Sequence, residues 1–136
     1  MKKVVSILLC IIACLSMCSC GGKDKIAKEV AKELEGQWGW QSLVGPCVET
    51  FKNASGNAGQ CEFVGANHTI GTYSVYMEDE ENGYVETTSQ GDVDESGNIT
   101  KKDKPITGVA YYFTYKDGKL SLYNSKNHSD PLVRIE

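Results

Sequence analysis

The sequence has few of the residues on which common enzyme chemistry depends. It contains two histidines, His68 and His128, and neither has a cysteine or a pair of acids nearby at the spacing of metal ligands. It also lacks a Gly-x-Ser-x-Gly nucleophile turn, a phosphate-binding glycine loop and a His-Glu-x-x-His zinc motif. Residues distant in the sequence can still meet in a fold, but no motif points to such a site. We therefore expect a protein that is not an enzyme and that needs no cofactor.

Basic residues are also scarce relative to acidic ones. The chain has 14 Lys and Arg against 18 Asp and Glu, a net charge of −4, and removing Lys2 and Lys3 leaves 12 against 18, a net charge of −6. The nearest basic cluster, "KKDK" at residues 101–104, is short and is interrupted by Asp103. A basic stripe or patch is the electrostatic footprint of nucleic-acid binding. We therefore expect no nucleic-acid partner.

A hydrophobic run long enough for a permanent membrane helix is missing as well. The apolar segment from Val4 to Cys20 has 17 residues, whereas a spanning helix needs roughly 20. It follows a short cationic start, "MKK", and gives way to the polar stretch "GGKDK" at residues 21–25. This arrangement is typical of a secretory signal sequence, so we expect an exported protein.

The end of this run resembles the lipobox of bacterial lipoproteins, in which a peptidase cuts just before a cysteine that carries a diacylglycerol thioether. Cys20 has the small Ser19 in front of it, whereas Cys18 has the bulky Met17 there, so we favour Cys20 and keep Cys18 as the alternative. The resemblance implies a signal peptide over residues 1–19. It also implies that an N-terminal lipid anchors the protein to the membrane of the bacterial cell envelope, at the outer membrane. The bland alternative is an ordinary signal peptide with incidental cysteines.

Cleavage before Cys20 leaves two further cysteines in the mature chain. Cys47 and Cys61 flank the glycine-rich segment "NASGNAGQ" at residues 53–60. In an exported protein such a pair favours a disulfide, which would add about 3 kcal/mol of stability for a loop near 15 residues. Redox-active thiols more often occur as Cys-x-x-Cys, which this pair does not form.

Between the signal and the main body, the sequence predicts one short helix over residues 23–36. Its apolar residues recur at helical spacing: Ile26, Ala27, Val30, Ala31 and Leu34. The stripe is narrow, so we expect a helix that closes one end of the following domain; the alternative is a helix that binds a membrane surface or a partner. Residues 20–35 thus form a lipidated tether with a short helix, and residues 36–136 form the domain.

The body alternates short segments rich in Val, Thr, Tyr and Phe with clusters of Gly, Asn and Asp, which is typical of strands and turns. The clearest hairpin has Asp117-Gly118 at its turn, and a second has Asn82-Gly83 at its tip. The expected strands cover residues 37–44, 48–52, 60–66, 70–77, 84–90, 107–115, 119–124 and 131–136, with a short one near 97–101. About eight antiparallel strands in so short a body predict an all-β fold, a small barrel or sandwich.

The motif "GQW" at residues 36–38, placed after a short helix and at the start of the first strand, resembles the Gly-x-Trp signature of lipocalins. The last strand carries Arg134, where that family often places an arginine over the tryptophan. The resemblance implies a lipocalin-like antiparallel β-barrel in which Gly36, Trp38 and Arg134 close one end. It covers most of residues 34–136.

An eight-stranded barrel has an interior that side chains either fill or leave open for one small ligand. We therefore keep two functional hypotheses. The first is a lipid-anchored envelope protein that binds a small apolar or amphipathic ligand. The second is a non-catalytic module with a filled barrel that contacts an envelope protein, as a protease inhibitor or as an accessory subunit of a surface uptake complex.

One further segment partly matches a calcium-binding loop. In "DVDESGNITKKD" the residues at template positions 1, 3, 5 and 12 are Asp92, Asp94, Ser96 and Asp103. Such oxygen ligands at alternate positions can wrap Ca²⁺, but the template has a Glu at its last position and helices on both sides. The alternative is a solvated hairpin turn with no metal.

Overall fold

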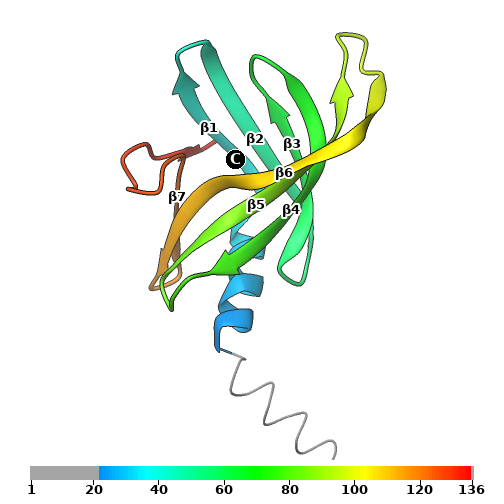
Figure 1. The fold of residues 1–136 in the computed structure, drawn as a ribbon. Coiled ribbons are helices and arrows are strands. Elements are labelled where there is room, and N and C mark those ends of the chain that lie inside the picture. The colour runs from blue at the N-terminus through cyan, green and yellow to red at the C-terminus, as the bar shows by residue number, and fades with distance from the viewer. Residues whose placement is uncertain (1–21, 136) are drawn as a thin grey trace, which may run out of the picture.

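The computed structural model describes residues 22–135, which form one helix followed by eight strands (Figure 1). The helix covers residues 22–34. The strands are β1 (Gly36–Ser42), β2 (Gly45–Ser55), β3 (Ala58–Val64), β4 (His68–Met77), β5 (Asn82–Val93), β6 (Ile99–Lys116), β7 (Lys119–Tyr123) and β8 (Val133–Arg134). No helix in this described part is long and apolar enough to cross a membrane. The expected signal peptide, with Cys18 and Cys20, lies outside the described residues.

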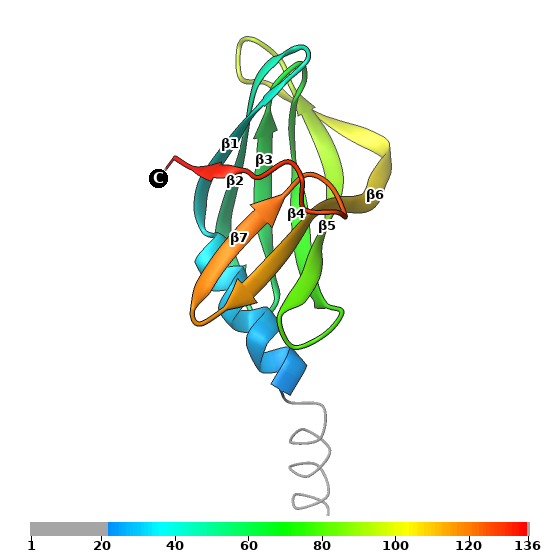
Figure 2. The ribbon, with the colours of Figure 1, turned by 90° about the vertical axis from the view of Figure 1, so that its left-hand side faces the viewer.

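All eight strands belong to one antiparallel sheet in the order β7-β6-β5-β4-β3-β2-β1-β8. The C-terminal segment closes this sheet into a barrel, because it contacts β7 on one side and β1 on the other (Figure 2). The amide of Leu132 donates to the carbonyl of Leu122 in β7 at 2.8 Å, and Arg134 pairs with Trp38 in β1. The predicted all-β fold, a small antiparallel barrel of about eight strands, is confirmed.

Strand β6 is longer than the sequence indicated, because it joins two segments that were expected to be separate. Ser89 of β5 pairs with Ile106 of β6. Gly91, two residues further along β5, pairs with Lys101, which is five residues from Ile106. The extra residues of β6 form a bulge, and Pro105 lies in it. A bulge tolerates proline because its residues make no ladder hydrogen bond. Pro105 therefore accompanies a bend in the strand rather than its end.

The hairpin between β4 and β5 turns earlier than expected. Its loop is formed by residues 78–81, where the Asp79 carboxylate accepts hydrogen bonds from the amides of Glu81 and Asn82, each at 2.8 Å. Asn82 and Gly83 are already in β5. A Cβ atom on Gly83 would lie 2.2 Å from the carbonyl oxygen of Tyr76, so this position needs glycine for a close strand contact and not for a turn.

The helix closes one end of the barrel, as predicted, and this end is densely packed (Figure 1). Val30, Ala31 and Leu34 are fully buried in the same hydrophobic cluster as residues from the strands. The hydroxyl of Tyr73 in β4 donates to the carbonyl of Ala31 at 3.3 Å. Burial of a narrow apolar face against strand residues is what holds so short a helix in place.

Gly36, Trp38 and Arg134 meet where the helix ends. Gly36 has a φ of 118°, a backbone conformation that favours glycine, and so turns the chain from the helix into β1. The Trp38 indole N–H donates to the carbonyl of Leu34 at 2.8 Å, and the Arg134 guanidinium lies 4.4 Å from the centroid of the indole. Arg134 also donates to the carbonyl of Glu35 at 2.9 Å and to that of Glu33. It therefore satisfies carbonyls that the end of a helix leaves without partners.

Candidate functional site

In the half of the barrel away from the helix, the interior is not completely filled. A cavity of about 180 Å³ lies among strands β2 to β6, and its wall includes Glu49, Cys61, Phe63, Thr88, Ser89 and Tyr111. Alternation along β2 explains how an acid comes to be there, since Cys47, Glu49 and Phe51 are the three buried positions of this strand. The cavity wall is therefore partly polar, unlike the core next to the helix.

Glu49 is the main polar group of this cavity. Its side chain is only 4% exposed, and its Oε1 accepts a hydrogen bond of 3.0 Å from the hydroxyl of Tyr111 in β6. No group among the described residues donates to Oε2, which is also buried. Burial raises the pKa of Glu49 to about 7, against the opposing effect of the Tyr111 hydrogen bond and with a small addition from the charge of Glu62. Both the ionised and the neutral carboxyl are therefore populated near neutral pH.

A second oxygen of the cavity wall also lacks a protein partner. The hydroxyl of Ser89 in β5 is buried and makes no hydrogen bond with any of the residues 22–135. Buried polar atoms are almost always hydrogen-bonded, and leaving one unpaired costs about 1–3 kcal/mol. The unpaired oxygens of Glu49 and Ser89, both residues of the cavity wall, would suit a ligand that donates hydrogen bonds.

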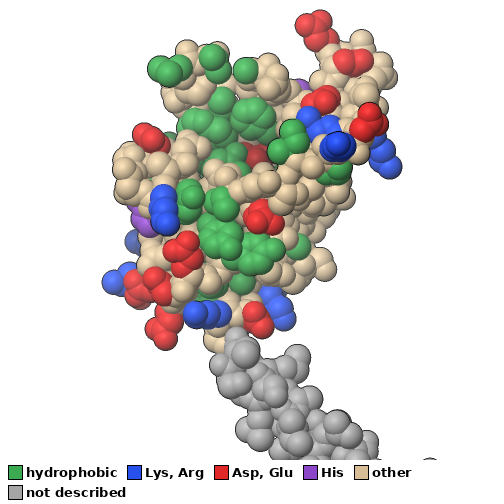
Figure 3. All heavy atoms as spheres, in the orientation of Figure 1, with side chains coloured by type: hydrophobic (Ala, Val, Ile, Leu, Met, Phe, Trp, Pro, Cys, Tyr) green, Lys and Arg blue, Asp and Glu red, His purple; other side chains and the backbone are tan. Residues whose placement is uncertain are grey.

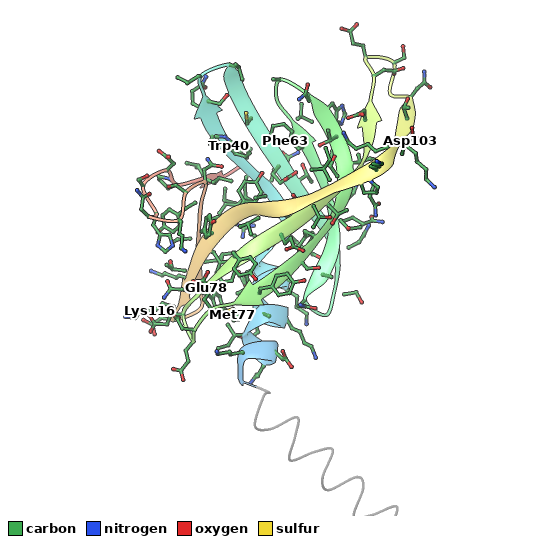
Figure 4. The ribbon with its side chains drawn as sticks, in the orientation of Figure 1. Trp40, Phe63, Met77, Glu78, Asp103 and Lys116 are labelled. Carbon is green, nitrogen blue, oxygen red and sulfur yellow. The ribbon has the colours of Figure 1, made fainter. Side chains whose placement is uncertain are left out.

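Aromatic side chains stand beside this polar group. The ring centroid of Trp40 in β1 lies 5.9 Å from that of Phe63 in β3 and 5.6 Å from that of Tyr111. Figure 4 shows Trp40 and Phe63 in the half of the barrel away from the helix. In Figure 3, hydrophobic side chains gather along the middle of the visible face, with acidic side chains among them. The site thus combines a carboxylate with flat apolar surfaces, which suits a small molecule that has one polar end.

Comparisons of the chain with protein-family models, with curated proteins and with solved structures find no match. The geometry of the cavity therefore carries the functional interpretation.

The predicted disulfide is not formed, because the register of β2 and β3 keeps its two cysteines apart. Cys47 and Cys61 are both free and buried. Cys61 pairs with Phe51, four residues along β2 from Cys47, which at ~3.3 Å per residue corresponds to about 13 Å. A disulfide needs Cα atoms within roughly 7 Å. Burial also raises the pKa of the Cys61 thiol to about 12, so it stays protonated.

The segment that partly matched a calcium loop forms the hairpin turn between β5 and β6. Asp94 Oδ1 accepts the amides of Ser96 (2.9 Å) and Asn98 (2.8 Å), and these contacts, that of Asn98 first, hold the pKa of Asp94 below its usual range. Asp92 makes an ion pair of 3.2 Å with Lys102. Figure 4 shows Asp103 at the bend of β6. Asp92 and Asp94 are thus held by strand and turn contacts, and the described residues form no group of three such ligands around one point.

The remaining candidate ligands do not converge either. His68 contacts the carboxylate of Glu62 at 2.7 Å, and the ring of His128 stacks on that of Tyr123 with centroids 4.4 Å apart. Between residues 22 and 135, no group of three or more His, Cys, Asp and Glu side chains is placed to hold a metal ion.

Sequence reasoning missed Glu49, Ser89 and Tyr111 as site residues. One signal was available for Glu49, because it occupies an inward position of the alternating segment "CVETF" in β2. A charged residue on the apolar face of a strand is unusual, since a buried carboxylate is costly unless it is partnered. Ser89 and Tyr111 carry no such signal, because serines and tyrosines are common on both faces of strands.

Proposed function

We propose that this protein is an exported lipoprotein that binds one small amphipathic ligand inside its barrel, next to Glu49. The observation that carries this proposal is Glu49, a residue of the cavity wall whose buried Oε2 atom has no hydrogen-bond partner among the described residues. A protein that needed this interior only for stability would do better with an apolar residue here, since a buried and half-paired carboxylate destabilises the fold.

The size and lining of the cavity narrow the class of ligand. A cavity of ~150 Å³ admits a molecule the size of benzene, and the cavity near Glu49 measures about 180 Å³. The part of the ligand that enters the cavity is therefore small, about one ring with a short substituent. Phe63 and Tyr111 offer apolar contact while Glu49 and Ser89 offer hydrogen-bond acceptors. These features favour an amphipathic ligand over a purely apolar one.

The anchor part of the proposal rests on the sequence. Cys20, with Cys18 as the alternative, is proposed to carry the lipid that holds the protein at the bacterial envelope, in the outer membrane. The helix at residues 22–34 leads into the closed end of the barrel (Figure 2). A lipid attached just before this helix places the closed end nearest to the membrane and the ligand cavity farther from it.

Native mass spectrometry of the full chain purified from its own host tests the ligand-binding proposal. We expect a bound mass of a small molecule on the wild type. Ser89→Leu should abolish it, because the larger side chain occupies the cavity, whereas Ser121→Leu makes the same change at an exposed position of β7 and should retain it. A wild-type protein that carries no small molecule, and whose melting temperature does not respond to extracts of its host, contradicts the proposal.

One observation favours the second candidate, a protein-interaction module. Leu43 and Val44, at the turn between β1 and β2, are 107% and 75% exposed. Apolar residues at an exposed loop tip are suited to insertion into a partner protein, such as a protease or a subunit of an uptake complex. Under this alternative, replacing both residues by Ser removes binding to the partner while the cavity variant Ser89→Leu leaves it unchanged.

A further inference from the structure

We infer that the ligand is a small protonated amine with a compact apolar body, and that its ammonium group binds the free oxygen of Glu49. This inference rests on the proposed function and specifies it, because it names the chemistry that the cavity recognises. It is carried by the charge of the cavity, by its two unpartnered oxygens and by its aromatic wall.

The charge of the cavity excludes an anion. Glu49 contributes a carboxylate, and among the described residues the further charge that acts on its pKa is another carboxylate, that of Glu62 in β3. Neither Lys nor Arg is among the described residues that line the cavity. A buried carboxylate without a counter-ion is unfavourable, and a cation that enters the cavity removes this cost. An anionic ligand would add to it.

The hydrogen-bonding groups of the wall suit an ammonium group. Oε2 of Glu49 and the hydroxyl oxygen of Ser89 can both accept a hydrogen bond, and neither has a partner among residues 22–135. An ammonium group brings up to three donors and no acceptor. The Tyr111 hydroxyl already donates to Oε1, so it holds the carboxylate in place and leaves Oε2 as the unpaired atom. Oε2 is buried, so an ammonium group reaches it only when the neighbouring side chains of the cavity wall move aside. Hydrogen bonds between a donor and a charged partner are the stronger kind.

The aromatic residues suit the rest of such a ligand. Phe63 and Tyr111 line the cavity, and Trp40 contacts both of them from β1. Aromatic faces attract a nearby cation and also give flat apolar contact to a ring. A carboxylate next to aromatic rings therefore selects a molecule with both features.

Binding of an ammonium group requires the ionised form of Glu49, so it depends on pH. The other titratable groups that act on this region are Cys47 in β2, Glu62 and Cys61 in β3, and Tyr111 in β6. Burial raises the pKa of Tyr111 as well as that of Cys61, so both stay neutral near pH 7. Because the pKa of Glu49 is about 7, affinity for an amine should rise as pH increases through that value.

Calorimetric titration of the full chain with two matched probes tests the inference. Benzylamine carries a cation on a ring of suitable size, and benzyl alcohol is its neutral counterpart. At about pH 8 we expect benzylamine to bind roughly tenfold or more tightly than benzyl alcohol, because a hydrogen bond to a charged group is worth more than a neutral one. The preference should shrink at about pH 5.5, where Glu49 is largely protonated.

Two variants test whether the charge of Glu49 causes the preference for benzylamine. Glu49→Gln keeps the size of the side chain and removes its charge, so benzylamine affinity should fall by roughly tenfold while that of benzyl alcohol changes little. Glu86→Gln is the matched control, because it removes a carboxylate of β5 that neither lines the cavity nor acts on the pKa of Glu49. It should leave the preference for benzylamine in place. A thermal melt of Glu49→Gln verifies that it folds, and the pH dependence of the wild type provides a second readout that needs no variant.

The outcomes separate this inference from the proposed function. Equal binding of both probes that is unaffected by Glu49→Gln but lost in Ser89→Leu overturns the amine and leaves ligand binding in the barrel standing. Failure of both probes to bind, together with a wild-type protein that carries no ligand, overturns both. Tighter binding of benzoate than of benzylamine also overturns the amine.

Discussion

The two ends of this barrel are built from the same strands but differ in packing. The end next to the helix is filled by side chains, whereas the other end contains a cavity. On the inner face of β2, Phe51 is 1% exposed and packs edge-on against Tyr73 with ring centroids 5.0 Å apart. Two residues earlier on the same face, Glu49 lies beside a cavity with an unpartnered oxygen. The comparison teaches that the densely packed core and the cavity occupy different parts of the same strands, with the core next to the helix.

The two tryptophans of β1 test this separation most strongly. Trp38 is buried at the closed end, and Trp40 is half-buried near the cavity. Trp38→Ala should lower the free energy of unfolding by about 4 kcal/mol, because it removes a large buried side chain. Trp40→Ala should cost about 1–2 kcal/mol, since less surface returns to water. Denaturant titration of both variants measures the difference.

Equal losses for the two tryptophan variants would show that the ends do not differ in packing. Should Trp38→Ala fail to fold, Leu34→Ala offers a milder probe of the same end, because Leu34 is fully buried in the helix. We expect it to lie between the two tryptophan variants, with a loss of about 3 kcal/mol.

The pH dependence of stability tests the burial of Glu49 in the half of the barrel that contains the cavity. The pKa of Glu49 is about 7 in the folded protein and 4.5 in the unfolded chain, so the folded state holds this proton more tightly. Stability is therefore highest below pH 4.5 as far as this group is concerned, and it falls as pH rises through 7, by about 3 kcal/mol in total. Denaturant titrations at about pH 5.5 and about pH 8 should reveal most of this loss.

Glu49→Gln is the control for that measurement, because it has no proton to release. We expect its stability to change little over the same range and to exceed that of the wild type at about pH 8. If the stability of the wild type changed with pH in the same way as that of the variant, this result would contradict the placement of Glu49 in a poorly solvated site.

Arg134 tests the join between the helix and the last strand. Arg134→Ala removes its contact with the Trp38 ring and its hydrogen bonds to the carbonyls of Glu33 and Glu35. The side chain is exposed, so we expect a modest loss of about 1–2 kcal/mol. Arg134→Lys keeps the charge but not the planar fork, and it should recover only part of the loss. Thermal melts of the three proteins compare these values, and a full recovery by Lys would contradict the proposed geometry.

The smallest effect is expected from reductant. Cys47 and Cys61 are free and buried in the structure, so mass analysis of unreduced protein should find a free thiol at each of these two positions. Both should react with a thiol reagent only after unfolding, and added reductant should leave the melting temperature unchanged. A drop in melting temperature on reduction would mean that β2 and β3 pair in a different register.

Local features of the fold could be predicted from the sequence, because the residues that decide them are neighbours. The Asp117-Gly118 turn is confirmed, with φ values of 53° and 72°. The helix was also predictable, since its apolar spacing is visible in one short segment. The calcium motif shows the limit of local patterns, because Asp94 can equally hold the amides of a tight turn.

The features that escaped prediction depend on residues far apart in the sequence. Tyr111 is 62 positions from Glu49, so the sequence around either residue does not predict their hydrogen bond. The disulfide prediction failed for a related reason, because the count of cysteines says nothing about the register between β2 and β3. The bulge at Pro105 likewise depends on how β6 meets β5.

The way in which the barrel is closed also fixes the order in which it can form. From β1 to β7, each strand pairs with its neighbour in the sequence, so these pairings can form progressively as the chain emerges. The contact between Arg134 and Glu35 spans 99 positions and must wait until the last strand is present. Until that moment the edges of β1 and β7 remain available to other chains, which is the usual route to aggregation. A chain shortened before Leu132 should therefore accumulate as aggregates, even though its cavity residues are all intact.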